Sequence, residues 1–343
     1  MSHYGTDYGT ARRADYGGAT SVDRDYQSVT GFGGASGTPV VSFVNVSKNY
    51  GSLKAVDGLN LDLRPGETTA LLGPNGAGKS TSLDMLLALR KPTSGQIKMF
   101  GSDPYHAVKS GRVGAMLQSG GLMPEVTVRE LVTLVTGFHP KPEPVETTLK
   151  RAGIAQFADQ RVDRLSGGQT QRVRFALAIC GKSELIVLDE PTTAMDVETR
   201  RLFWNSMKEE VAEGRTLLFA THYLEEADQA ADRILVINRG RLLADGTPAE
   251  IKARAGAKRL SFHLDKVDEQ FLLGLPGLVN LEVRHDFVQV QTSDSDATLY
   301  AILDAGYRPS EIEVTGLGLE QAFLAITAED DATNGNADAG ETI

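Results

Sequence analysis

The sequence predicts an α/β protein: a core built around a P-loop, with an inserted helical subdomain, followed by a small ferredoxin-like α+β domain. Three observations support this prediction. The apolar run 68–72 leads through a glycine-rich loop into a helical stretch, as expected of a P-loop core. A mostly helical segment, about 119–165, lies between two strand-bearing regions. From about residue 258 the pattern reads β-α-β-β-α-β, which is typical of a ferredoxin-like fold.

Composition limits the classes to which the protein can belong. The chain has 343 residues, 41% of them hydrophobic, and a formal net charge of −10, which fits a globular protein of two domains with tails. An acidic balance disfavours binding to nucleic acid, for which a basic excess is typical. The one cysteine, Cys180, excludes an internal disulfide and fits a reducing compartment. We find no segment near the roughly 18 apolar residues of a membrane span and no secretion signal, so we expect a cytosolic protein that reaches a membrane only through a partner.

The expected domains run from 39 to 255 and from 258 to 327. Residues 1–38 are rich in Gly, Tyr, Ser, Thr and Asp, and residues 328–343 are acidic and polar. Segments of this composition bury too little apolar surface to offset their ordering entropy, so we expect both to be disordered. The repeated tyrosines of the first segment leave two interpretations open, an inert solvated extension and a regulatory or adhesive tail.

The most informative stretch is the loop that fits the pattern G-x-x-x-x-G-K-[ST]. It consists of Gly73, Pro74, Asn75, Gly76, Ala77, Gly78, Lys79, Ser80 and Thr81. Glycines let successive backbone N–H groups surround an anion, and the following helix adds a favourable dipole. Lys79 would contact the β- and γ-phosphates, and the Ser80 hydroxyl would bind Mg²⁺. The sequence therefore predicts a nucleotide site here.

Charged side chains follow two further strands that read as fully buried. Asp189 and Glu190 end the apolar run 185–188, and His222 comes shortly after the run 216–220. The carboxyl ends of parallel strands meet at the edge where α/β proteins bind ligands. We expect Asp189 to hold Mg²⁺ through water, Glu190 to orient or activate a water, and His222 to contact the γ-phosphate. A solvated acidic turn and a purely structural histidine are the alternatives.

Two more candidates are weaker on their own. Ser166, Gly167, Gly168 and Gln169 precede a helix and could form a second anion-binding helix N-terminus. Tyr50 precedes a turn, where its ring could stack on a purine or simply pack at the end of a strand. The residues alone do not decide between these two roles for Tyr50.

Taken together and in this order, these motifs resemble the ATP-binding cassette (ABC) ATPases over roughly residues 40–250. The sequence LSGGQ, which ends at Gln169, is highly specific to that family. The resemblance implies that 73–81 is the Walker A loop, that 185–191 is the Walker B strand and that Tyr50 stacks on adenine. Met195 departs from the leucine common before the D-loop aspartate, and its similar size and apolar character make this change conservative.

The resemblance also assigns roles to residues that the motifs alone do not explain. Gln118 corresponds to the lid glutamine that contacts Mg²⁺, Asp196 to the D-loop aspartate and His222 to the switch histidine. The catalytic set would be Glu190, His222, Lys79 and Gln118, and the metal set Ser80, Gln118 and Asp189. The expected cofactors are ATP and Mg²⁺.

The resemblance implies a head-to-tail dimer around two ATP molecules. A second copy, or a related cassette subunit, would supply Ser166, Gly167, Gly168 and Gln169 to the γ-phosphate. The remaining partner would be an integral membrane permease, which places the chain on the cytoplasmic face of the cell membrane. The ending 319–324 looks like that of the daunorubicin-resistance type, which exports drugs, antibiotics or lipids.

The alternative function is a soluble cassette ATPase that acts on nucleic acid or the ribosome. Such proteins usually carry two cassettes, long coiled coils or zinc-binding cysteines. This chain has one cassette, no sustained heptads and one cysteine, so we expect transport and no nucleic-acid partner.

Overall fold

The computed structural model describes residues 38–118 and 120–338. The disorder expected of residues 1–37 and 339–343 lies outside the described residues. Within the described ranges, no helix is both long enough and apolar enough to cross a membrane.

A six-stranded sheet forms the centre of the first domain, in the order β5-β6-β7-β3-β8-β9. Its first five strands run parallel to one another, and β9 is antiparallel to β8. Strands β3, β6, β7 and β8 are buried along their whole length, which explains why their sequences are continuous apolar runs. The strand bounds are β3 Thr68–Leu72, β5 Val113–Met116, β6 Leu185–Asp189, β7 Thr216–Thr221, β8 Arg233–Asn238 and β9 Arg241–Gly246.

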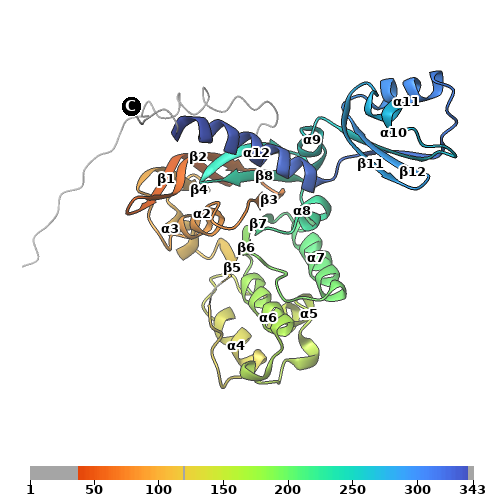
Figure 1. Ribbon diagram of the computed structural model, residues 1–343. Helices are drawn as coiled ribbons and strands as arrows, with labels where there is room; N and C mark the ends of the chain where they lie inside the picture. Colours follow the sequence, from red (N-terminus) through yellow and green to blue (C-terminus); the bar gives the residue numbers. More distant parts are fainter. Residues whose placement is uncertain (1–37, 119, 339–343) are drawn as a thin grey trace, which may run out of the picture. The chain divides into compact units, whose positions relative to one another are not determined.

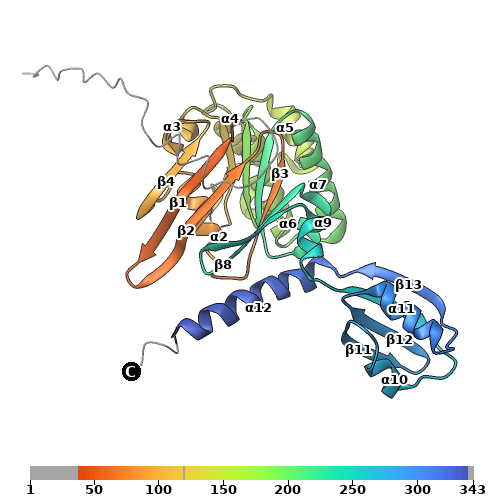
Figure 2. The same ribbon diagram turned by 90° about the horizontal axis from the view of Figure 1, so that it is seen from above.

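A second, antiparallel sheet has the order β2-β1-β4 (Figure 2). Its strands are β1 Val41–Tyr50, β2 Leu53–Leu63 and β4 Ser94–Met99. Strand-like alternation in the sequence ends at Val46, but β1 continues to Tyr50. Register shifts along the pair let Lys48, Asn49 and Tyr50 still pair with β2, and polar residues therefore extend a strand that alternation alone ends early.

Two apolar cores cover the two faces of the central sheet. Alternate residues of β3 divide between them: Ala70 and Leu72 belong to one core, and Leu71 to the other. The core that contains Leu71 also contains the inner side of the antiparallel sheet and of α2 Lys79–Leu86. The opposite core contains residues of α7 Val197–Ala212, α8 Leu224–Ala230 and α9 Pro248–Ala253.

The helices between β5 and β6 lie together in Figure 1. They are α4 Val128–Thr136, α5 Val145–Arg151 and α6 Gly167–Ile179, with short 3₁₀ turns Ala155–Phe157 and Val162–Arg164. Val132, Leu149 and Val173 bury one side of each helix in a shared apolar core. The short helix α3 Pro104–Lys109 comes before β5.

The second domain has an antiparallel sheet of its own, in the order β11-β12-β10-β13. Its elements are β10 Lys258–His263, α10 Glu269–Leu273, β11 Leu278–Arg284, β12 Phe287–Thr292, α11 Ser295–Asp304 and β13 Ser310–Gly316. The order β-α-β-β-α-β agrees with the ferredoxin-like prediction. Leu260, Phe262 and Ile302 lie in a separate apolar core, so this domain has its own hydrophobic interior.

The last helix, α12 Leu319–Asp338, corrects two expectations. It was grouped with the second domain, but Leu319, Ala322 and Ile326 are buried in the core of the first. It packs against α8 and α9 (Figure 1). Apolar spacing identifies the buried face of a helix but not its partner. The helix also continues through 328–338, where disorder was expected, and Asn238 Nδ2 donates to Asp330 Oδ2 at 3.1 Å.

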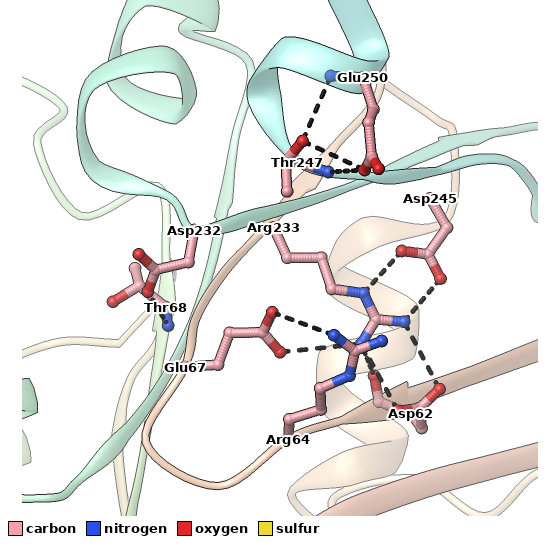
Figure 3. A network of polar contacts seen from close by, with 9 residues as sticks. All are labelled: Asp62, Arg64, Glu67, Thr68, Asp232, Arg233, Asp245, Thr247 and Glu250. Carbon is pink, nitrogen blue, oxygen red and sulfur yellow. Dashed lines mark hydrogen bonds and ion pairs between the residues drawn. The ribbon is translucent and has the colours of Figure 1, made fainter. Parts of the chain in front are cut away.

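A network of charges joins the two sheets at the edge where the parallel strands begin (Figure 3). Arg233 of β8 is 3% exposed, and its Nε and Nη2 donate to the two oxygens of Asp245 at 2.6 Å. Its other contacts are Asp62 of β2 at 3.5 Å and Glu67 at 3.8 Å. Burial lowers the pKa of Arg233, but the carboxylates of Asp245 and Asp62 more than offset this and raise it above its usual value. The network fixes β2 against β8 and β9.

Candidate functional site

The P-loop lies between β3 and α2, and its glycines are required by the backbone. Gly78, the N-cap of α2, has φ +101°, and a Cβ there would collide with the carbonyl oxygen of Ala55. A Cβ on Gly73 would collide with the carbonyl oxygen of Ile237. The β8–β9 turn supports the loop, since Gly240 N–H donates to the Ala77 carbonyl at 2.9 Å. The loop is therefore held on two sides in a conformation open only to glycine at Gly78.

Lys79 is buried beside this loop. Its Nζ donates to the carbonyl oxygens of Gly73 at 2.6 Å and Pro74 at 3.3 Å. Burial lowers the pKa of Lys79, and the nearby carboxylates of Glu190 and Asp189 oppose that shift. Burial of the ammonium group therefore carries a desolvation cost that a bound anion would relieve, and phosphate contact by Lys79 stays a prediction.

Asp189, at the carboxyl end of β6, is the candidate metal ligand. Its side chain is 3% exposed, and Oδ1 has no hydrogen-bond partner among the described residues. Burial raises the pKa of Asp189, whereas a hydrogen bond with the Ser80 side chain lowers it. The described ranges hold no cluster of three or more His, Cys, Asp or Glu side chains suited to a metal. Mg²⁺ commonly uses one or two carboxylates together with phosphates and water, so Asp189 and Ser80 fit it.

Glu190 and His222 form the most direct contact of the site. Glu190 Oε2 lies 2.8 Å from His222 Nδ1. An ionised carboxylate only accepts hydrogen bonds, so this contact is a hydrogen bond when His222 carries a proton on Nδ1. Glu190 has φ +50°, an uncommon backbone conformation for a non-glycine residue, and its N–H donates to the Ala220 carbonyl at 2.9 Å. The backbone is thus held in a strained conformation that aims a buried carboxylate at a histidine whose side chain is 45% exposed.

A buried carboxylate that the sequence did not predict, Glu226, contacts residues next to Glu190 and His222. Glu226 of α8 contacts the Thr192 hydroxyl, accepts from Thr221 Oγ1 at 3.3 Å and pairs with Arg200 Nε at 3.2 Å. Burial raises the pKa of Glu226, and its partners Thr192 and Arg200 lower it. Thr192 lies shortly after Glu190 in the sequence, and Thr221 lies directly before His222. Glu226 therefore connects the segment that carries Glu190 to the segment that carries His222. Glu225 and Glu226 are adjacent acids in sequence, and only packing distinguishes the buried one.

Ser166 and Gln169 cap α6 rather than contact the P-loop. Ser166 Oγ accepts from Gln169 N–H at 3.3 Å, and Gln169 Oε1 accepts from Ser166 N–H at 2.9 Å. Within the described residues, no hydrogen bond or ion pair joins 166–169 to 73–81. Gly167 and Gly168 instead lie close to Ala194, so a side chain on either would crowd the loop after β6. Ser166, Gly167 and Gly168 stay a prediction of nucleotide contact.

Asp196 is the N-cap of α7. Its carboxylate accepts from Thr199 N–H at 2.7 Å, and this hydrogen bond lowers the pKa of Asp196. The capping role accounts for the aspartate locally and leaves its expected D-loop role untested.

Tyr50 and Gln118 are both exposed. Tyr50 is 40% exposed, with Lys48 Nζ 5.3 Å and Arg90 Cζ 5.5 Å from its ring centre. Gln118 follows β5, and its backbone oxygen accepts from Arg174 Nη1 at 3.5 Å. Stacking on adenine by Tyr50 and metal contact by Gln118 stay predictions.

Comparison with known proteins gives a family match. Residues 56–193 match the family model described as ABC transporter. This range includes the P-loop, Gln118, the α6 N-terminus and the Asp189–Glu190 pair, and it ends before His222.

Curated relatives extend the match beyond that range. One is the Nod factor export ATP-binding protein I of Paraburkholderia xenovorans (strain LB400), 38% identical over 62% of this chain and 72% of the relative. Another is the daunorubicin resistance ATP-binding protein DrrA3 of Streptomyces coeruleorubidus, 33% identical over 82% of this chain and 94% of the relative. The second alignment is long enough to take in much of the second domain.

Solved structures agree with the fold of the first domain. A dimeric ATP-binding cassette in a post-hydrolysis state, bound to ADP and Pi, is 27% identical, with TM-score 0.56. The match covers 60% of this chain and 98% of that cassette. A second solved structure, the ATP-binding subunit of an ABC transporter, is 24% identical, with TM-score 0.59. The match covers 63% of this chain and 93% of that subunit, and at this identity it supports the fold alone.

Proposed function

The chain belongs to the ATP-binding proteins of ABC transporters, and from this premise we propose that its hydrolysis of ATP drives export through a separate membrane permease. The observation that carries the proposal is the Glu190–His222 contact beside the buried Lys79 and Asp189. In this proposal Glu190 is the base for water, Lys79 is the phosphate-binding cation and Asp189 is a metal ligand.

Export is favoured by the kind of relatives that the chain resembles. Their names refer to Nod factor export and daunorubicin resistance. We infer that the exported substrate is a drug, an antibiotic or a lipid-like compound. In this proposal a separate permease selects the substrate. The chain would then act at the cytoplasmic face of the membrane.

In the proposed mechanism, Glu190 accepts a proton from the water that attacks the γ-phosphorus, and the bond from this phosphorus to the β–γ bridging oxygen breaks. The backbone strain at Glu190 and the His222 contact restrict the orientations of the carboxylate. Lys79 stabilises negative charge on the phosphate oxygens. Tyr50 would stack on the adenine, and its exposed ring is accessible for that contact.

Asp189, Ser80 and Gln118 are the residues that would hold Mg²⁺. The ion would supply positive charge to the β- and γ-phosphates. Support comes from Asp189 Oδ1, a buried carboxylate oxygen without a partner among the described residues. The hydroxyl of Ser80 lies against the same carboxylate.

We further propose that two copies assemble head to tail around two ATP molecules. The N-terminus of α6 makes no hydrogen bond to the P-loop of its own chain in the described part, so a second chain could bring Ser166, Gly167 and Gly168 to the nucleotide. A homodimer is the first expectation, and a related cassette subunit is the alternative partner. Asp196, the N-cap of α7, follows Ala194 and Met195, which lie close to Gly168, and in the proposal it faces the partner.

Glu190→Gln tests the role of the proposed base. The amide retains size and polarity but cannot accept the proton, so kcat should fall by about 10²- to 10⁴-fold while ATP still binds. A long-lived dimer with ATP should accumulate, which size-exclusion chromatography with and without ATP would detect. Glu225→Gln, at an exposed acid on α8, is the matched control and should leave kcat unchanged.

Wild-type turnover by Glu190→Gln would exclude Glu190 as the base. The same ATPase assay, repeated with single-stranded nucleic acid, separates transport from the alternative function. Stimulation by nucleic acid would overturn the export proposal, whereas an unchanged rate and co-purification of an integral membrane protein from membranes would support it.

A further inference from the structure

Arg174 lies on α6 and is not one of the residues assigned to ATP binding or hydrolysis. Its guanidinium donates to three neutral oxygens. Nη2 donates to the Gly120 carbonyl at 2.7 Å, and Nη1 donates to the Gln118 carbonyl at 3.5 Å and to Gln171 Oε1 at 3.1 Å. One side chain therefore binds the backbone of the segment that carries Gln118 and a second side chain of its own helix.

Gln171 continues this connection to the base. It is 5% exposed, and its Nε2 donates to the backbone carbonyl of Glu190 at 3.1 Å. Residues three apart lie on the same face of a helix, so Arg174 and Gln171 face the same side of α6. Two side chains thus connect the backbone at Gln118 to the backbone at Glu190.

The charge of Arg174 is not balanced by a carboxylate. It forms no ion pair within the part of the chain that the structure describes, and its buried Nε–H has no hydrogen-bond acceptor there. A half-buried cation without a counter-charge adds little to stability, because its desolvation is not repaid. Removal of Arg174 should therefore disturb the position of its acceptors more than the stability of the fold.

We propose that Arg174 is a positioning residue for ATP hydrolysis, which couples the placement of Gln118 to the orientation of Glu190 through Gln171. The proposal rests on the function proposed above and adds to it a role for a residue outside the nucleotide motifs. The N-cap of the helix that carries Arg174 is Ser166, the residue proposed to contact the partner's nucleotide. A movement of α6 on dimerisation would then change the orientation of Glu190 through the hydrogen-bonded side chains of Arg174 and Gln171.

Steady-state kinetics of Arg174→Ala tests the proposal. Loss of hydrogen bonds from a charged donor should lower kcat by about tenfold to a hundredfold. KM for ATP should change by less than about twofold, because the P-loop binds the phosphates independently, and Tm should stay near that of the wild type. Arg174→Lys, which can reach one carbonyl but lacks the planar fork, should recover part of kcat.

A double-mutant cycle with Gln171→Ala tests the path itself. If Arg174 acts through Gln171, the double variant should lose no more kcat than the more affected single variant. Arg174→Gln is a second neutral variant, in case the alanine variant does not fold. Arg129→Ala is the control, since this half-buried arginine of α4 pairs with Asp159 and Glu146 and not with Gln118 or Gln171.

Normal kcat in Arg174→Ala or Arg174→Gln would overturn the proposal, and so would additive losses in the cycle or an equal loss in Arg129→Ala. A wild-type chain without ATPase activity would instead overturn the proposed function. A reduced kcat with unchanged KM, unchanged Tm and non-additive losses would support the positioning role.

Discussion

The two edges of the central sheet treat buried charge in opposite ways. At the edge where the parallel strands begin, Arg233 is surrounded by Asp245, Asp62 and Glu67, and both acceptor oxygens of Asp245 are bonded. At the edge where they end, Asp189 Oδ1 has no hydrogen-bond partner among the described residues, and Lys79 donates only to neutral carbonyls.

This difference separates stability from chemistry. Charges that are balanced within the chain hold the two sheets together and need no ligand. Charges that are buried but incompletely balanced have shifted pKa values, downward for Lys79 and upward for Asp189, chiefly because of desolvation. A phosphate and a cation would complete these groups, so the second edge is the one suited to bind a charged ligand.

The largest expected effect is on the balanced edge. Arg233→Ala removes the cation that contacts Asp245, Asp62 and Glu67, and should lower the free energy of unfolding by about 3–5 kcal/mol. Chemical denaturation followed by circular dichroism would measure it. Arg241→Ala is the control, because Arg241 also pairs with an aspartate of β2, Asp57, but is half exposed and should cost only about 0–1 kcal/mol. Equal losses in the two variants would contradict the distinction.

A smaller effect on stability is expected on the open edge. Lys79→Ala removes two hydrogen bonds to carbonyls but also removes a cation whose burial is unfavourable. The free energy of unfolding should change by less than about 2 kcal/mol, whereas ATP binding, measured by calorimetry, should be lost. Normal ATP affinity in this variant would contradict the P-loop assignment.

The smallest expected effect concerns pH. Because the pKa of Asp189 is raised in the folded state, the folded protein holds this proton more tightly than the unfolded chain. This group therefore adds stability as pH falls through its folded pKa and removes it as pH rises. Asp189→Asn should be slightly more stable than wild type near pH 7, and this advantage should shrink towards pH 4. Thermal unfolding of both proteins over that range measures the difference, and a constant gap would contradict it.

Local sequence patterns predicted the parts of the site that local structure makes. The P-loop, Asp189, Glu190 and His222 each end or follow a buried strand, and strand order then brings them to one edge. Glu226, Gln171 and Arg174 were missed because their roles depend on which loops pack against α6 and α8. The sequence pattern along 258–316 similarly predicted the strands and helices of the second domain, in which β11 and β12 form a local hairpin.

The larger errors concern distant partners. The apolar face of α12 is visible in the sequence as Leu319, Ala322 and Ile326, but nothing in that spacing says which domain it covers. Neighbourhood in the chain suggested the second domain, and the structure places these residues in the core of the first.

The position of α12 has a consequence for synthesis on the ribosome. The apolar core that α12 completes includes Ala70 of β3, and the whole second domain is translated after Ala70 and before α12. Domains generally fold in order as they emerge, but here the first cannot finish its core until Ile326 has left the exit tunnel. The second domain can therefore fold first, while apolar surface of α8 and α9 stays uncovered and open to chaperones or to misassembly.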